Sequence, residues 1–251
     1  MLRPRVIPCL LLRNNGFVKT VNFKNPTYLG DPINIIKIFN EKEVDELIIL
    51  DILASKENKD PNLKLIEQIV SEAFMPVCYG GGIRTSEQIK DLLAIGVEKV
   101  AINTNAIKNI NLISDASEKF GNQCIVGAID IKKNFFNKAS VYSANNEKVH
   151  ITNVVEWSKI LVKYGAGELL LNSVDNDGMM SGYDLNIIKA VTQEVSVPVI
   201  ACGGAGNIRH FKQAINEAAV SAVAAGSFFV FHGKHKGVLI SYLDQNEIME
   251  L

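Results

Sequence analysis

The sequence predicts an α/β fold, closed as a (β/α)8 TIM barrel, and three observations support this prediction. The chain has 251 residues, 47% of them hydrophobic, which suits one barrel domain. Strand-like apolar runs alternate with amphipathic stretches along the whole length, with no Pro- or Ser-rich linker between them. The two halves of the chain also resemble each other. Strands that alternate with helices of this size pair in parallel through right-handed crossovers, which leads to a barrel.

Eight short apolar runs bounded by polar or turn residues are expected to be strands buried on both faces. They are Val6–Leu12, Glu46–Ile52, Pro76–Tyr79, Lys99–Asn103, Cys124–Asp130, Glu168–Asn172, Pro198–Cys202 and Ala219–Ala225. Amphipathic stretches predict the helices Ile33–Phe39, Asn62–Ala73, Ser86–Ala94, Asn109–Lys119, Val154–Tyr164, Leu185–Glu194 and Ile208–Glu217. A polar and aromatic segment at about 134–150 departs from this alternation and predicts a hairpin inserted after the fifth strand.

The internal similarity indicates how the barrel is organised. Pro76–Arg84 is echoed by Pro198–Gly206, and Glu46–Leu50 is echoed by Glu168–Asn172, at nearly the same offset. Such self-similarity predicts one domain over residues 1–251, made of related half-barrels of about 1–122 and 123–251. Each half is then expected to carry an equivalent site.

Composition excludes several classes of function. A net charge of -1 gives no basic surface for nucleic acid or membranes. No apolar run approaches the length of a membrane span, and the N-terminus lacks the apolar core of a signal peptide. The cysteines Cys9, Cys78, Cys124 and Cys202 are far apart and favour reduced core thiols in a cytoplasmic protein over a metal site or disulfides. No metal or other cofactor is expected.

Asp130 is the first candidate for a catalytic residue. The stretch Val126–Lys133 carries this one carboxylate at the expected carboxyl end of a buried strand, which is where α/β barrels place their chemistry. The alternative is an aspartate that only caps the next element.

Two glycine clusters predict phosphate-binding loops. Gly80–Gly82 and Gly203–Gly206 each follow a strand and precede a helix, so that backbone N–H groups can approach an anion closely. A further strand follows each cluster and ends in small or polar residues, at Ala101–Thr104 and at Ala224–Ser227. The alternative for either cluster alone is a tight turn. Two clusters at matching positions favour a ligand with a phosphate at each end, bound by Gly81, Gly82, Asn103, Thr104, Gly203, Gly204, Ala225 and Gly226.

These residues resemble the cyclase subunit of imidazole glycerol phosphate synthase over essentially the whole chain. The matching motifs are Arg5–Leu10, Lys19, Gly30–Pro32, Tyr79–Ile83, Ile102–Thr104, Ala128–Asp130, Asp175–Gly178, Ser181–Asp184 and Cys202–Gly206. The resemblance implies an enzyme of lyase type in histidine biosynthesis. It would take ammonia from a partner glutaminase, close an imidazole ring on a bisphosphate substrate and release an aminoimidazole carboxamide ribotide. It also implies that Lys19 lies in a mobile loop over the substrate, and that Asp51, Asn172 and Asp177 line the mouth. The alternatives are a solvated lysine for Lys19 and a turn aspartate for Asp177.

One position departs from the family pattern. The family reaction uses an acid/base carboxylate at the end of the first strand and another at the end of the fifth. Asp130 matches the second, but Leu11 occupies the place of the first, and Val6–Leu12 contains no acid. A leucine side chain cannot transfer a proton, and losing a general acid or base typically costs about 10²–10⁴-fold in rate.

The resemblance also places a charged ring at the opposite end of the barrel. Arg5, Glu46, Lys99 and Glu168 begin the first, second, fourth and sixth strands and match the family's gate to an ammonia passage. The alternative is four ordinary ion-paired strand starts.

Three hypotheses about function follow. The first is a divergent paralogue that docks a glutaminase and passes ammonia to another amidation. It resembles the paralogues of bacterial surface-sugar (O-antigen-type) pathways, in which an ATP-using sugar amidotransferase makes an amidino sugar. The second is a working cyclase in which water or another residue replaces the missing acid. The third is a non-catalytic scaffold that activates the glutaminase.

Overall fold

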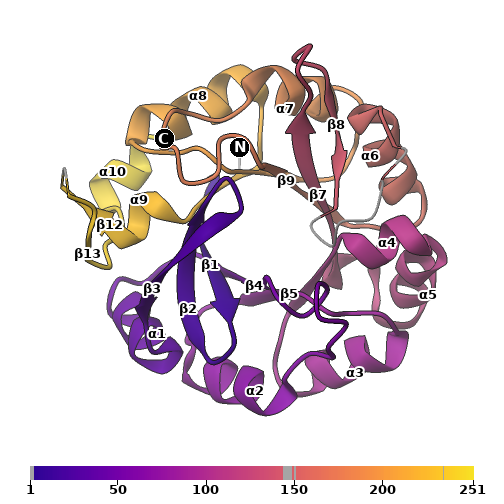
Figure 1. The fold of residues 1–251 in the computed structure, drawn as a ribbon, viewed down its shortest axis with the longest axis horizontal. Helices are drawn as coiled ribbons and strands as arrows, with labels where there is room; N and C mark the ends of the chain where they lie inside the picture. The colour runs from indigo at the N-terminus through magenta and orange to yellow at the C-terminus, as the bar shows by residue number, and fades with distance from the viewer. Residues whose placement is uncertain (1–2, 144–148, 150, 234) are drawn as a thin grey trace.

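The computed structural model describes residues 3–143, 149, 151–233 and 235–251, and these form one closed barrel (Figure 1). Its parallel strands are β1 (Arg5–Arg13), β4 (Leu47–Asp51), β5 (Val77–Gly80), β6 (Lys99–Ile102), β7 (Ile125–Lys133), β9 (Glu168–Ser173), β10 (Val199–Cys202) and β11 (Ala222–Ala225). Neighbours pair in chain order, and β11 pairs with β1 to close the sheet. The predicted (β/α)8 barrel is confirmed.

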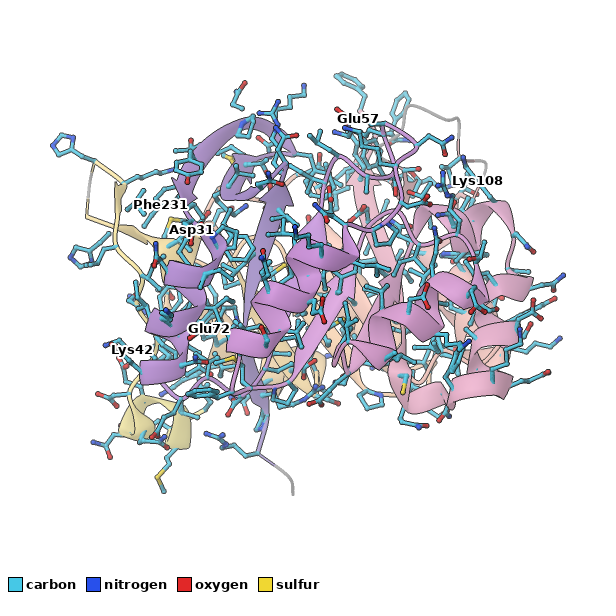
Figure 2. The ribbon with its side chains drawn as sticks, turned by 90° about the horizontal axis from the view of Figure 1, so that it is seen from below. Asp31, Lys42, Glu57, Glu72, Lys108 and Phe231 are labelled. Atoms are coloured by element: carbon cyan, nitrogen blue, oxygen red, sulfur yellow. The ribbon has the colours of Figure 1, made fainter. Side chains whose placement is uncertain are left out.

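Helices surround the strands, as Figure 1 shows. The longer ones are α1 (Pro32–Glu41), α2 (Leu63–Glu72), α3 (Ser86–Ala94), α5 (Asn111–Phe120), α6 (Val154–Lys163), α7 (Leu185–Thr192) and α8 (Ile208–Ala218). Shorter ones are α4 (Thr104–Lys108), α9 (Ser227–Val230), α10 (Gln245–Met249) and the 3₁₀ turn η1 (Asn122–Cys124). In Figure 2, α1 descends from Asp31 to Lys42, so the lower end of the view is the end at which the strands begin. The Asp31 side chain caps α1 by accepting the N–H of Asn34 at 3.1 Å.

Hairpins extend the sheet on the side where the strands end. β8 (Ala139–Tyr142) pairs antiparallel with β7, and residues 144–148 and 150 of the predicted insertion lie outside the described residues. Because β8 supplies hydrogen-bond partners, β7 runs on to Lys133, so the expectation that the strand ends at Asp130 is wrong. A second hairpin, β2 (Gly16–Val21) and β3 (Lys24–Gly30), follows β1, where the family resemblance implied a mobile loop. A small ladder, β12 (Phe231–His232) with β13 (Gly237–Val238), follows α9.

The core has two parts. The larger cluster of buried apolar residues lies between the strands and the helices. The smaller fills the barrel interior and contains Ile7, Cys9, Ile48, Cys78, Ala101, Val126, Leu170, Ile200, Cys202, Ala222 and Ala224. Three of the four cysteines are therefore buried inside the barrel, and Cys124, in η1, is partly buried. All four are free thiols, as the sequence predicted.

Candidate active site at the carboxyl ends of the strands

A pocket opens where the barrel strands end. Each residue that the sequence predicted for catalysis or ligand binding lines it: Lys19, Asp51, Gly81, Gly82, Asn103, Thr104, Asp130, Asn172, Asp177, Gly203, Gly204, Ala225 and Gly226. Cys9, Ala101, Ala128, Leu170 and Cys202 also line the pocket, so its floor reaches the residues that fill the barrel interior.

Asp130 is held between the carboxamides of the two neighbouring strands. Asn103, just after β6, donates from Nδ2 to Asp130 Oδ2 at 2.8 Å, and Asn172 of β9 donates from Nδ2 to Oδ1 at 3.1 Å. Burial raises the pKa of Asp130 from 3.8 to about 7 because it disfavours the charged carboxylate more than the two donated hydrogen bonds stabilise it. A carboxyl group with a pKa near neutrality can both give and take a proton, which is what a general acid/base needs.

Leu11 faces Asp130 from the far side of the mouth. β1 and β7 lie four strands apart in either direction around the closed sheet, so their ends are opposite each other. Leu11 is buried and lines the pocket, with Leu50 and Val18 beside it on the neighbouring strands. The side chain opposite Asp130 across the mouth is therefore apolar.

The β2–β3 hairpin folds back over the mouth and is fixed there by Asp177. Lys19 is only 5% exposed, and its Nζ lies 2.5 Å from Asp177 Oδ1. Thr20 Oγ1 donates to Asp177 Oδ2 at 2.7 Å, and the N–H of Asn22 donates to the Asp177 carbonyl at 2.8 Å. In this structure Lys19 is thus not a solvated loop lysine, and the carboxylate of Asp177 binds the hairpin rather than only ending a turn.

Sequence reasoning missed an aromatic contact that joins the two hairpins. Phe23, at the β2–β3 turn, packs edge to face against Tyr142 of β8, with ring centroids 6.3 Å apart. Lys132 Nζ lies 5.1 Å from the centre of the Tyr142 ring. Phe23 has a φ of 61°, which bulky residues adopt only under strain, and it also lines the pocket. No pairwise spacing in the sequence could have indicated this contact, because it joins segments more than a hundred residues apart.

The glycine clusters form the two sides of the pocket as the sequence predicted. A Cβ on Gly81 would lie 2.6 Å from the carbonyl oxygen of Asp51, and one on Gly204 would lie 2.1 Å from that of Gly182. Both have positive φ, 125° and 120°, so no other residue fits either place without strain. The helices α4 and α9 begin directly after Asn103 and Gly226, and neither receives a side-chain cap at its N-terminus. Backbone N–H groups at both sides of the mouth are thus left uncapped by side chains, a property that anion sites share.

Asp51 has a structural contact in addition to its place in the pocket. Its Oδ1 accepts the N–H groups of Leu53 and Ala54 at 2.9 and 3.0 Å. Burial raises its pKa above the usual value of 3.8, although these hydrogen bonds oppose the shift. Ser227, at the strand end beside the second glycine cluster, also lines the pocket, and its buried Oγ makes no hydrogen bond.

The four charged residues at the other end of the barrel form one ion-paired ring. Arg5 pairs with both Glu46 and Glu168. Lys99 Nζ lies 3.0 Å from Glu46 and 2.9 Å from Glu168, so each cation contacts both anions. Burial lowers the pKa values of Arg5 and Lys99, but the attraction of the two glutamates outweighs it, and both end above their usual values. The ring lies beneath Cys78 and the other interior residues, and its charges balance.

The described residues contain no group of three or more His, Cys, Asp or Glu side chains that could hold a metal ion. None of the helices described by the structure is both long and apolar enough to span a membrane.

Comparison with known proteins places this geometry in context. Residues 5–236 match the model of a family described as "Histidine biosynthesis protein". A protein of Pseudomonas aeruginosa with the provisional name imidazole glycerol phosphate synthase subunit hisF2 is 53% identical over 248 residues, 99% of each chain. A Vibrio vulnificus protein with the provisional name subunit hisF3 is 46% identical over 98% of this chain and 95% of its own. The imidazole glycerol phosphate synthase subunit HisF of Streptococcus sanguinis is 42% identical over 91% of each chain.

Proposed function

Because this chain belongs to the histidine biosynthesis protein family, as a HisF-type barrel of imidazole glycerol phosphate synthase, we propose that it receives ammonia from a partner glutaminase and passes it to an amidation other than ring closure. The observation that carries the second half of this proposal is Leu11. The pocket keeps one partly buried carboxyl group with a pKa near 7, Asp130, and has an apolar side chain opposite it. A reaction that moves protons at both sides of the mouth lacks one of its two groups here.

The ion-paired ring supports the first half of the proposal. Partly buried charges are costly unless they are paired, and the four ring residues pair completely among themselves at the end of the barrel away from the pocket. Above the ring, the interior is lined by small and apolar side chains such as Cys78 and Ala101. Such a lining suits a small neutral molecule such as ammonia, which we propose enters when the ring opens toward a docked glutaminase.

The pocket supports a phosphorylated ligand. We propose that a small molecule with a phosphate at each end spans the two glycine-lined sides, with one phosphate at Gly81–Gly82 and the other at Gly203–Gly204. Lys19 would complete the second side, because it lies against Gly226. A Cβ added to Gly226 would lie 2.8 Å from Lys19 Cε. A bare scaffold for the glutaminase would have no need for two such sides, so the pocket disfavours the scaffold hypothesis.

The resemblance to surface-sugar paralogues indicates the acceptor of the ammonia. We infer an amidation in surface-sugar synthesis, in which an ATP-using sugar amidotransferase forms an amidino group. The numbered provisional names hisF2 and hisF3 of two relatives support only the paralogue part of this inference.

A working cyclase is the second candidate function, and Asp130 favours it. Its raised pKa is suited to acid/base work, and one carboxyl group with water as the second proton carrier would permit slow ring closure.

Ammonia-dependent turnover of the cyclase substrate by the purified chain separates the two candidates. We expect no measurable turnover by the unmodified chain and a gain of about 10²-fold or more over background in Leu11→Asp, since a general acid/base typically supplies about 10²–10⁴-fold. Leu11→Asn is the matched control because an amide has nearly the same shape but cannot transfer a proton. Robust turnover by the unmodified chain would exclude the proposed function in favour of the cyclase. Calorimetry would separately compare a bisphosphate ligand with a monophosphate, and equal affinities would contradict a two-phosphate pocket.

A further inference from the structure

Phe74 is an exposed aromatic residue at the end of the barrel that carries the ion-paired ring. It lies between α2 and β5 and is 86% exposed, whereas the next residue, Met75, is buried. Glu72, two residues earlier, is labelled in the lower half of Figure 2, at the opposite end of the barrel from Glu57. A single exposed apolar side chain is common on protein surfaces, so its exposure alone assigns no role.

The backbone that carries Phe74 is held from both sides by one residue of α1. The Asn40 Oδ1 atom accepts the Phe74 N–H at 3.0 Å, and Asn40 Nδ2 donates to the Glu72 carbonyl at 2.8 Å. These two hydrogen bonds fix the turn while the phenyl ring stays in solvent. A rigidly presented aromatic side chain loses little conformational freedom when a partner covers it, which is a property of strong contact residues at interfaces.

The chain that follows Phe74 runs between two strands whose starts supply ring residues. β5 is the strand between β4 and β6, and Glu46 immediately precedes β4 while Lys99 begins β6. The N–H of Leu47 donates to the Pro76 carbonyl at 2.9 Å, and the N–H of Glu98 donates to the Val77 carbonyl at 3.0 Å. Pro76 and Val77 are therefore hydrogen-bonded to residues next to Glu46 and Lys99.

We propose that Phe74 is the apolar anchor through which this end of the barrel binds the glutaminase. The inference rests on the proposed function, in which a glutaminase covers the ring. The glutaminase would offer an apolar pocket for the Phe74 side chain, next to polar groups that contact the ion-paired ring. Few interface residues dominate affinity, and aromatic anchors near the centre of an interface are prominent among them.

The test is the affinity of the purified chain for the HisH-type glutaminase of the same organism, measured by calorimetry. Phe74→Ala should raise Kd by at least about tenfold, which is the loss expected for an interface anchor. Phe136→Ala is the matched control, because Phe136 is also 86% exposed but lies at the tip of the β7–β8 hairpin, on the pocket side. The Kd of the Phe136→Ala variant should stay within about twofold of that of the unmodified chain. Phe74→Leu should recover part of the affinity. At saturating concentrations, the Phe74→Ala variant should still activate the glutaminase fully.

Two outcomes overturn the inference in distinguishable ways. If the unmodified chain binds the glutaminase and Phe74→Ala binds it equally tightly, the anchor is wrong while the proposed function stands. If the unmodified chain does not bind the glutaminase at all, the docking step of the proposed function fails and the anchor fails with it. Sedimentation of the chain alone tests whether a second copy of the chain covers Phe74 instead. A dimer that Phe74→Ala converts to a monomer would show that it does.

Discussion

Asp130→Asn tests the electrostatics of the pocket through stability rather than activity. In the folded chain the pKa of Asp130 is raised from 3.8 to about 7 by burial, so the folded state holds its proton more tightly than the unfolded state does. Between these two values the folded state binds more protons, and stability therefore falls as pH rises from about 4 to about 7 and levels off above that. An asparagine at this position has no such titration.

The magnitude follows from the size of the shift. Three pKa units correspond to about 4 kcal/mol, which is the full cost of ionising Asp130 in the folded protein. Between about pH 5 and pH 8 roughly 3 kcal/mol of this cost should develop. The variant also changes the hydrogen bonds with Asn103 and Asn172, by about 1 kcal/mol each, but that change is an offset that does not depend on pH.

Urea denaturation of both proteins at a series of pH values measures this difference. We expect the stability of Asp130→Asn relative to the unmodified chain to rise by roughly 3 kcal/mol from about pH 5 to about pH 8. Asp115→Asn, an exposed change on α5, is the control for the substitution itself. A flat difference for Asp130→Asn, or one that falls with pH, would refute the raised pKa and with it the acid/base role.

The remaining predictions concern the two ion-paired groups. Lys19→Met leaves the buried carboxylate of Asp177 without its cation and should cost about 3–5 kcal/mol. Hydrogen exchange should become faster in residues 16–30, while Lys24→Met, an exposed change in the same hairpin, should stay within about 0.5 kcal/mol. Glu168→Gln breaks the ring and should also cost about 3 kcal/mol in urea denaturation. Glu194→Gln, which breaks only the exposed pair with Lys159, should cost less than about 1 kcal/mol. Equal losses of stability in Glu168→Gln and Glu194→Gln would contradict a coupled ring.

Alternation of short apolar runs with amphipathic stretches was sufficient to predict the barrel strands and the longer helices. This works because strands buried on both faces must be apolar throughout, and helices that cover them must be apolar on one side. The half-barrel division stays a prediction, although the order of elements repeats: β1 and β7 each continue into an antiparallel hairpin, and α4 and α9 each follow a short strand. The β2–β3 hairpin was missed because its residues alternate only over a few positions and its turn uses Asn22 and Phe23 at positive φ.

The sequence by itself determined which residues could reach the mouth, because the carboxyl ends of parallel strands in a closed barrel converge whatever the details of packing. It also placed Leu11 at the end of the first strand, where the family resemblance implies a second acid. Only the tertiary structure decided the protonation of Asp130, since its pKa depends on burial and on the amides of two other strands. The same holds for Lys19, whose charge is neutralised by Asp177 from the other half of the chain. Contacts between residues distant in sequence set these properties, and no local pattern encodes them.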